Sequence, residues 1–170
     1  MIEREPQTTR PVDRIAPYEQ KYFFSCGPAS LSICYKALGH SHTEERIMRE
    51  MHASVDGTDW TELLHHVVDI TEYGASMRFR ATYGEMKEEL DKFGYPIIVC
   101  WQTDRRRVPV EGGMGAEPAG HYSVVKAMDD ESITLADPGF GDIVTFTKEY
   151  FDERWYEENT ERAYLAIRPR

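Results

Sequence analysis

The chain has 170 residues, 41% of them hydrophobic and 29% charged, and it carries a net charge of −10. This length and apolar content suit one domain with one core. An excess of acidic side chains disfavours binding to nucleic acid, because the phosphate backbone attracts Lys and Arg. The one basic run, Arg105–Arg107, is expected to be a solvated loop. We therefore predict no nucleic-acid partner.

The three cysteines, Cys26, Cys34 and Cys100, form no CxxC pair. An odd count without such a pair disfavours both a disulfide framework and a structural zinc site. Free thiols fit a reducing compartment, and the charged N-terminus has no apolar run typical of a signal peptide. No stretch approaches the roughly 20 apolar residues of a membrane span. We expect a cytoplasmic protein with no membrane span, no metal and no other cofactor.

The first half of the chain has the signals of an irregular arm followed by helices. Residues 1–17 hold three prolines and many charges and are predicted to be the arm, which leaves residues 18–170 as the single domain. Capping residues and glycine stops predict four helices, which with their caps cover about residues 25–38, 41–52, 59–74 and 82–94. A strand over residues 76–81 is expected between the third and fourth helices.

The second half changes to short apolar runs separated by turns. We predict a helix at about residues 147–156 and strands over residues 95–102, 121–128, 132–136, 142–146 and 163–167. Helices followed by an antiparallel sheet are typical of the α+β class. A Gly- and Pro-rich stretch, residues 103–120, interrupts the pattern, and loops of such length tend to be functional or disordered. We expect residues 103–120 to form a mobile flap that covers a cleft in the protein, and the alternative is a solvated insertion.

Cys26 opens the first predicted helix. A helix N-terminus carries partial positive charge and unpaired N–H groups, so it stabilises a thiolate, which is the nucleophilic form of cysteine. The alternative is a small buried core residue, which is how most free cysteines behave. Cys34 and Cys100 fit that second interpretation, because one lies on an apolar helix face and the other inside an apolar strand.

A nucleophilic cysteine needs a base, and the base needs a group that orients it. His121 starts one predicted strand, and Asp137 ends the next. Two strands joined by a tight turn are antiparallel neighbours, so we expect the Asp137 carboxylate to hold the His121 imidazole in one tautomer. The alternative role for Asp137 is turn formation, because Pro and Gly follow it. The other histidines are expected at the surface, namely His40, His42, His52, His65 and His66.

Gln20 lies six residues before Cys26. Acyl transfer builds an oxyanion, which needs hydrogen-bond donors aimed at it. The backbone N–H of Cys26 can supply one donor, and the side-chain amide of Gln20 can supply the second. Without the neighbouring cysteine, Gln20 would be interpreted as a surface side chain.

Three motifs follow one another along the chain: Gln20-x5-Cys26-Gly27-Pro28-Ala29, Gly120-His121-Tyr122-Ser123-Val124-Val125 and Ala136-Asp137-Pro138. Together they resemble the papain-like cysteine peptidases that process double-glycine leader peptides of bacteriocins, over roughly residues 18 to 168. The resemblance implies a papain-like α+β fold with four functional residues: the nucleophile Cys26, the general base and acid His121, the orienting Asp137 and the oxyanion donor Gln20.

In many members of that family the peptidase domain is fused to a membrane transporter. No transporter follows in this sequence, so we expect a stand-alone domain that acts on a peptide substrate. An association with a separate transporter stays open.

Four functions compete at this point. The leading hypothesis is a thiol hydrolase that cleaves a peptide or amide bond, after a double-glycine leader, through an acyl-enzyme on Cys26. The second is an acyltransferase or transpeptidase that uses the same site, as in phytochelatin synthases and some antibiotic acyltransferases, which resemble this fold. The third is a non-catalytic peptide-binding domain, although such relatives usually lack the cysteine. The fourth is a metal site of no known ligand spacing, with candidate ligands His65, His66, His40, His42 and Cys34.

Overall fold

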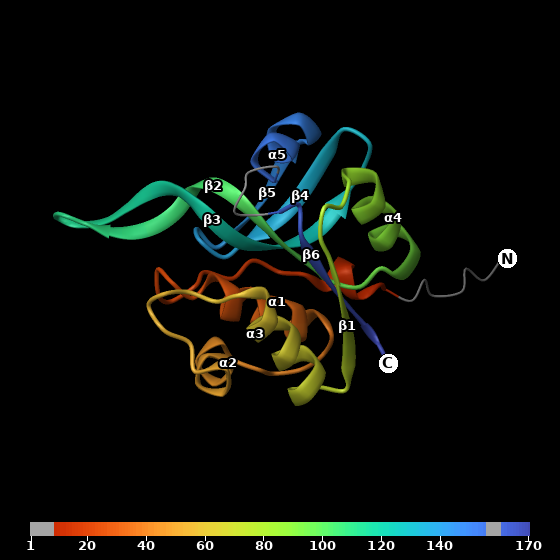
Figure 1. The fold of residues 1–170 in the computed structure, drawn as a ribbon, viewed down its shortest axis with the longest axis horizontal. Helices are drawn as coiled ribbons and strands as arrows, with labels where there is room; N and C mark the ends of the chain where they lie inside the picture. The colour runs from red at the N-terminus through yellow and green to blue at the C-terminus, as the bar shows by residue number, and fades with distance from the viewer. Residues whose placement is uncertain (1–8, 156–160) are drawn as a thin grey trace, which may run out of the picture.

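A six-stranded antiparallel sheet lies against a group of three helices from the first half of the chain (Figure 1). The structure, a computed structural model, describes residues 9–155 and 161–170, with the side chains of these residues except 104–110 and 113–119. The helices are α1 (Cys26–Ala37), α2 (Glu44–Met51), α3 (Trp60–His65), α4 (Tyr83–Phe93) and α5 (Lys148–Trp155). Two short segments are the 3-10 helix η1 (Pro11–Arg14) and the π-helical turn η2 (His66–Ile70).

The strands follow the order β1-β6-β2-β3-β4-β5 across the sheet, and all neighbouring pairs are antiparallel. They are β1 (Tyr73–Arg78), β2 (Ile97–Val110), β3 (Gly113–Met128), β4 (Ser132–Asp137), β5 (Asp142–Thr147) and β6 (Tyr164–Pro169). Helices α1–α3 lie on one side of the sheet and α5 lies on the other (Figure 1), which confirms the predicted α+β class. Among the described residues, no helix is both long and apolar enough to cross a membrane.

Among the first four helices, α3 and α4 begin as their capping signals predict, whereas α2 begins two residues later than predicted, with Thr43 and not Ser41 at its N-cap. The side chains of their N-cap residues each accept a hydrogen bond from a backbone N–H three residues further on, and these residues are Thr43, Asp59 and Thr82. Gly94, in the left-handed conformation at φ 64°, ends α4 as expected. Ser25 precedes α1, but its side chain makes no cap hydrogen bond and bonds to Glu44 instead, which corrects its predicted role.

The third helix ends earlier than predicted. α3 stops at His65 and passes into η2, while Gly74, the predicted helix end, lies in β1. β1 begins at Tyr73 because residues 73–78 pair with β6 at the edge of the sheet. Pairing with a distant strand therefore overrides the local helical pattern here.

Residues 9–17 belong to the segment predicted as an irregular arm. They contain η1, and Val12 and Ile15 are buried in the hydrophobic core. The backbone N–H of Val12 also donates to the Gly94 carbonyl at 3.1 Å. This part of the predicted arm is packed against the domain, whereas residues 1–8 lie outside the described residues.

Residues 104–119, predicted to be part of a loop, form a two-stranded ribbon that extends β2 and β3 away from the body of the protein (Figure 1). The two strands stay paired as far as Val110 and Gly113. Gly112, at φ 89°, supplies the left-handed conformation in the turn between them. The prediction of an unpaired loop was wrong, because Gly and Pro lower local strand propensity but pairing along the extended strands decides the outcome.

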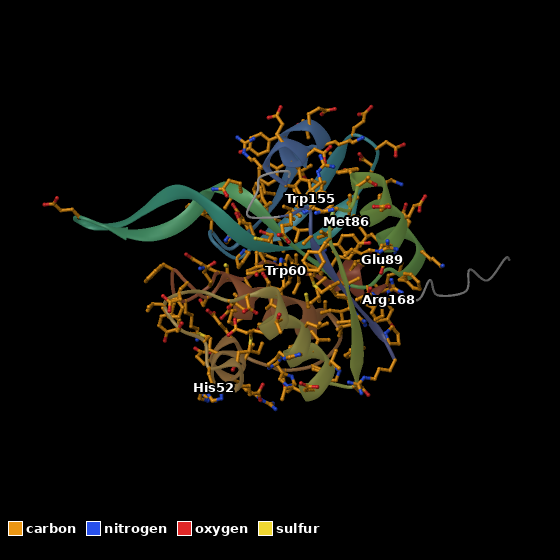
Figure 2. All side chains as sticks on the ribbon, in the orientation of Figure 1. His52, Trp60, Met86, Glu89, Trp155 and Arg168 are labelled. Atoms are coloured by element: carbon orange, nitrogen blue, oxygen red, sulfur yellow. The ribbon has the colours of Figure 1, made fainter. Side chains whose placement is uncertain are left out.

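The core supports the sheet from both sides. Trp101 on β2 is fully buried and donates its indole N–H to Ser123 Oγ at 3.0 Å. Trp155 on α5 is also fully buried and donates to the Ala163 carbonyl at 3.1 Å. Figure 2 shows Trp155 on the α5 side of the sheet and Trp60 near the helices α1–α3. Because the indole N–H groups of Trp101 and Trp155 are both hydrogen-bonded, these two large side chains can be buried in the core without an unsatisfied polar group.

Replacing residues 104–118 with Asn-Gly would join the paired residues Thr103 and Ala119 by a two-residue hairpin turn. We expect the melting temperature to change by no more than about 4 °C, because the core described above lies outside the ribbon. Selectivity among peptide substrates should change, because the ribbon continues the strand that carries His121.

Calorimetry, the rate of Cys26 alkylation by iodoacetamide, and turnover of a peptide panel would measure these effects. The alkylation rate should stay at the wild-type value and serves as the control. Unchanged kinetics across the peptide panel would mean that the ribbon is a solvated insertion.

Candidate active site

Cys26 is the first residue of α1 and is 9% exposed. α1 is buried along most of its length, so packing sets the position of its first turn. Thr58 lies directly against Gly27, where an added Cβ would be 2.8 Å from the Thr58 Cβ. Glycine is therefore required for this close approach, which fixes the start of the helix. The partial positive charge of the helix N-terminus acts on a thiol that is held in place.

His121 on β3 and Asp137 at the end of β4 are both fully buried. Nε2 of His121 lies 2.6 Å from Oδ1 of Asp137, a hydrogen bond that becomes an ion pair when the ring is protonated. The same carboxylate oxygen accepts the Gly139 N–H at 2.8 Å. A Cβ at Gly139 would lie only 3.2 Å from the imidazole, so glycine lets the turn close over the pair. The structure thus brings together the histidine and the aspartate that the sequence paired.

The Cys26 side chain approaches the imidazole from the helical half of the protein. Burial would lower the pKa of His121, but hydrogen bonding to Asp137 and the interaction with Cys26 outweigh it and raise the pKa to about 9. Nδ1 is the ring nitrogen that remains for Cys26, and it has no partner at full hydrogen-bond geometry. The contact with Cys26 nevertheless raises the pKa of His121, and catalytic hydrogen bonds often tighten only when substrate is bound.

Gln20 lies between the start of α1 and the turn after Asp137. Its backbone N–H donates to the Pro138 carbonyl at 2.8 Å, which ties it to the end of β4. Its side chain is largely buried, and Nε2 donates to the Tyr22 carbonyl at 2.6 Å. One amide hydrogen is thus used to fix the side chain, and one remains. Sequence reasoning missed both partners, because a contact to a backbone carbonyl leaves no signal in the side-chain pattern.

Exposed apolar side chains occur on the same segments that build the site. Tyr22 is 46% exposed and stacks on Phe24, with ring centroids 5.6 Å apart. Phe140 is 37% exposed and lies in the turn after Asp137. Neither residue was predicted to belong to the site, although the aromatic run at residues 22–24 was an available signal.

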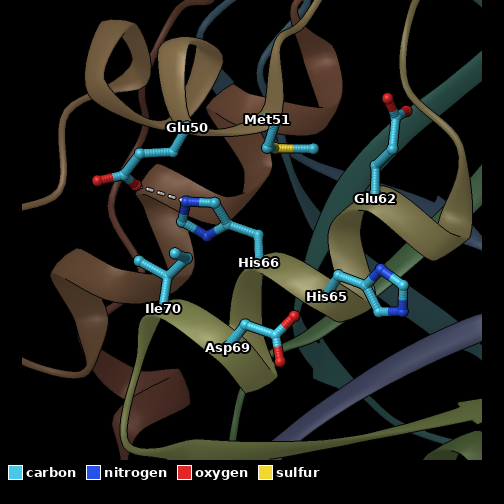
Figure 3. A pocket seen from close by; sticks show the side chains of 7 residues that line it. All are labelled: Glu50, Met51, Glu62, His65, His66, Asp69 and Ile70. Carbon is cyan, nitrogen blue, oxygen red and sulfur yellow. Dashed lines mark hydrogen bonds and ion pairs between the residues drawn. The ribbon is translucent and has the colours of Figure 1, made fainter.

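One histidine that was predicted at the surface is buried. His66 is 3% exposed, and its Nδ1 lies 2.7 Å from the Tyr35 hydroxyl. Its Nε2 lies 2.7 Å from the Glu50 carboxylate, as Figure 3 shows. Burial lowers the pKa of His66 despite the hydrogen bond to Glu50. The prediction was wrong because η2 turns this side chain toward α1 and α2. Its neighbour His65 is exposed.

The other two cysteines are core residues, as predicted. Cys34 and Cys100 are buried and lie outside any disulfide. Burial raises the pKa of Cys34, so this residue stays protonated at neutral pH. Over residues 9–155 and 161–170, no group of three or more His, Cys, Asp or Glu side chains is placed to hold a metal ion.

The family model and the solved structures reported below place this protein in the peptidase-like class. The model of the Peptidase_C39 like family matches residues 12–163, and the chain belongs to this family. The resemblance to peptidases that process double-glycine leaders, which the three motifs indicated, is confirmed at the level of the family and its fold.

Solved structures share the fold. The peptidase domain of Streptococcus ComA, a bifunctional ABC transporter involved in a quorum sensing pathway, has a TM-score of 0.70 at 17% identity and covers 92% of this chain and 99% of its own. A double glycine motif protease from an AMS/PCAT transporter, in complex with the leader peptide, has a TM-score of 0.67 at 20% identity and covers 96% of both chains. An uncharacterized protein of Methanothermobacter thermautotrophicus is 30% identical over 132 residues, which are 78% of this chain and 77% of that protein.

We expect Cys26 to be the thiol that iodoacetamide modifies fastest, and to remain reactive at about pH 6. An ordinary thiol with a pKa of about 8.5 is only roughly 0.3% ionised at that pH. His121, with its pKa raised to about 9, stays an imidazolium through neutral pH and favours the neighbouring thiolate. Above that pKa the ring loses its proton, and the advantage of Cys26 over an ordinary thiol disappears.

Mass mapping of the alkylated residues across this pH range would measure the profile. His121→Ala is the matched variant, and its Cys26 profile should move toward that of an ordinary thiol. Faster labelling of Cys34 or Cys100 in the folded wild type would show that the nucleophile has been wrongly assigned.

Proposed function

We propose that this protein is a cysteine peptidase that cleaves a peptide bond through an acyl-enzyme on Cys26. The observation that carries the proposal is the buried His121, which is bonded through Nε2 to Asp137 and has its pKa raised by both Asp137 and Cys26. Membership of the Peptidase_C39 like family supports it.

The reaction follows the order of groups in the site. The Cys26 thiolate attacks the carbonyl carbon of the substrate, and the His121 imidazolium donates its proton to the departing amine nitrogen as the C–N bond breaks. The neutral imidazole then takes a proton from a water molecule, which attacks the thioester. The acid product leaves, and the thiolate–imidazolium pair is restored. Asp137 keeps the ring in one orientation through both steps and stabilises its positive charge.

Gln20 is the proposed side-chain donor to the oxyanion. Its hydrogen bond to the Tyr22 carbonyl and the backbone link to Pro138 hold the amide before the substrate arrives. A donor that is already oriented stabilises the transition state without any cost of reorganisation. The backbone N–H of Cys26, at the start of α1, is the second donor.

The proposed substrate is a peptide cut after a double glycine. Support comes from the similar structure of a double glycine motif protease in complex with a leader peptide. The exposed rings of Tyr22 and Phe140 suit a peptide with apolar side chains, and the net charge of −10 favours a basic one. A separate transporter is the proposed partner, since another similar structure is the peptidase domain of a transporter.

We expect Cys26→Ala and His121→Ala to lower turnover by roughly 10⁴- to 10⁶-fold, because each removes a group that exchanges bonds or protons with the substrate. Asp137→Ala should retain more activity, because Asp137 acts by orienting His121. A positionally scanned peptide library with mass-spectrometric product analysis would provide the assay, with and without an added amine to detect acyl transfer.

Circular dichroism would verify that each variant is folded, and Cys34→Ala is the matched cysteine control with wild-type turnover. Wild-type rates in the His121 variant would require a different base. A wild-type protein that forms no thioester with any peptide would refute the proposed reaction.

We expect Gln20→Ala to slow acylation by roughly 10²- to 10³-fold, the usual effect of losing one oxyanion donor. Substrate affinity should change little, because the interaction forms as charge develops on the oxygen. Two measurements separate these effects. The single-turnover acylation rate is compared between the wild type and Gln20→Ala. The dissociation constant of the peptide is measured in the unreactive Cys26→Ala background, with and without the Gln20 change. A loss confined to affinity would instead make Gln20 a residue that positions substrate.

A further inference from the structure

Glu44, the first residue of α2, is a charged side chain buried at 1% exposure. Its Oε2 accepts the Tyr18 hydroxyl at 2.7 Å, and the backbone N–H of Lys21 lies 3.1 Å from Oε1 and 3.2 Å from Oε2. Oε1 also accepts the Ser25 hydroxyl. Both carboxylate oxygens are therefore satisfied by donors, which is what burial of an ionised group requires.

All three partners of Glu44 lie in residues 18–25, which we call the lead-in segment. This segment carries Gln20 and ends directly before Cys26. Within it, the Tyr22 carbonyl accepts Gln20 Nε2 at 2.6 Å and the Ser25 backbone N–H at 3.2 Å. Gln20 is thus tied to a carbonyl that belongs to the turn held by Glu44.

The hydroxyl of Ser25 explains how Glu44 acts on the start of α1. Ser25 occupies the N-cap position, where a serine normally accepts a hydrogen bond from an N–H of the first turn. Here its side chain makes no such bond. Its single hydrogen can serve one acceptor, and a carboxylate is a stronger acceptor than the Tyr22 carbonyl, which lies 2.9 Å away. Ser25 Oγ also accepts the Tyr22 backbone N–H at 3.2 Å, so Glu44 and Tyr22 together hold the Ser25 side chain away from the first turn of α1.

We propose that Glu44 is a positioning residue for the catalytic centre. Through Lys21 and Ser25 it fixes the lead-in segment, which sets the Gln20 amide and keeps the Ser25 side chain off the helix terminus that faces the reacting atoms. This inference rests on the proposed peptidase function. It adds a residue from α2 to a site otherwise built from α1, the sheet and the segment before α1.

Glu44→Gln tests the inference, because it keeps the shape of the side chain and removes the charge and one acceptor oxygen. A displacement of about 1 Å in a catalytic group can cost on the order of 10²-fold in rate. We expect single-turnover acylation to fall roughly 10- to 100-fold with substrate affinity unchanged. Alkylation of Cys26 by iodoacetamide at about pH 6 should also slow by roughly 2- to 5-fold. The released Ser25 hydroxyl would accept a hydrogen bond from an N–H group in the first turn of α1, and the Cys26 thiolate would lose part of the stabilisation that the helix N-terminus gives it.

A double-mutant cycle with Gln20→Ala distinguishes positioning from general loss of structure. If Glu44 acts through Gln20, most of the acylation loss caused by Glu44→Gln disappears in the Gln20→Ala background, so the two losses are not additive. Full additivity, or a loss confined to affinity, would overturn the inference. Wild-type acylation and alkylation in Glu44→Gln would overturn it as well.

Two further variants complete the experiment. Glu45→Gln is the matched control, because Glu45 is the next residue on α2 and pairs with the Lys21 side chain at the surface; it should keep wild-type rates. An equal loss in Glu45→Gln would overturn the assignment to Glu44. If Glu44→Gln does not fold, Ser25→Ala breaks the same contact from the other side and should slow acylation, and wild-type acylation in it would overturn the inference.

The alkylation measurement separates this inference from the proposed function. If no peptide acylates Cys26 in the wild-type protein, the proposed function is contradicted. The effect of Glu44→Gln on Cys26 alkylation needs no peptide substrate, so an unchanged alkylation rate would still refute the role of Glu44 at the start of α1.

Discussion

The site depends on keeping an imidazole and a carboxylate side by side with no exposure to water. His121 and Asp137 have no accessible surface, and an unpaired charge in such a place would strongly destabilise the fold. Their 2.6 Å hydrogen bond satisfies one nitrogen of the ring and one oxygen of the carboxylate. The pairing requires β3 and β4 to be neighbours, and a Cβ at Gly139 would crowd it at 3.1 Å from Asp137 Oδ1 and 3.2 Å from the imidazole. The order of the strands and the glycine in the turn therefore both favour the contact between His121 and Asp137.

The proposed nucleophile comes from the other half of the protein. Cys26 belongs to the helical group, whereas His121 and Asp137 belong to the sheet, so their alignment depends on how α1 packs against β3. The lead-in segment crosses this boundary. It is held on the sheet side by the bond from Gln20 to Pro138 and on the helical side by Glu44. A small shift between the two halves would separate Cys26 from His121, so the proposed reaction depends on the core beneath α1.

Much of the fold could be predicted wherever the signal was local. The capping boxes at Asp59 and Thr82 place two helix starts correctly, because both partners lie within three residues of each other. The ribbon at residues 104–119 could not be predicted, because its glycines and prolines argue against a strand and only pairing between β2 and β3 makes one. The early start of β1 has the same cause, since its partner β6 lies about 90 residues away.

The sequence by itself determined the chemical groups of the candidate site: a cysteine at a helix start, a histidine and an aspartate on adjoining strands, and a glutamine upstream. Side-chain type and short-range spacing carry that information, so it can be read without coordinates. The tertiary structure decided the environment of these groups: the complete burial of His121, its raised pKa, the anchoring of Gln20 and the contacts of Glu44. Desolvation and hydrogen bonding between distant segments depend on how the whole chain packs, and no local pattern encodes them.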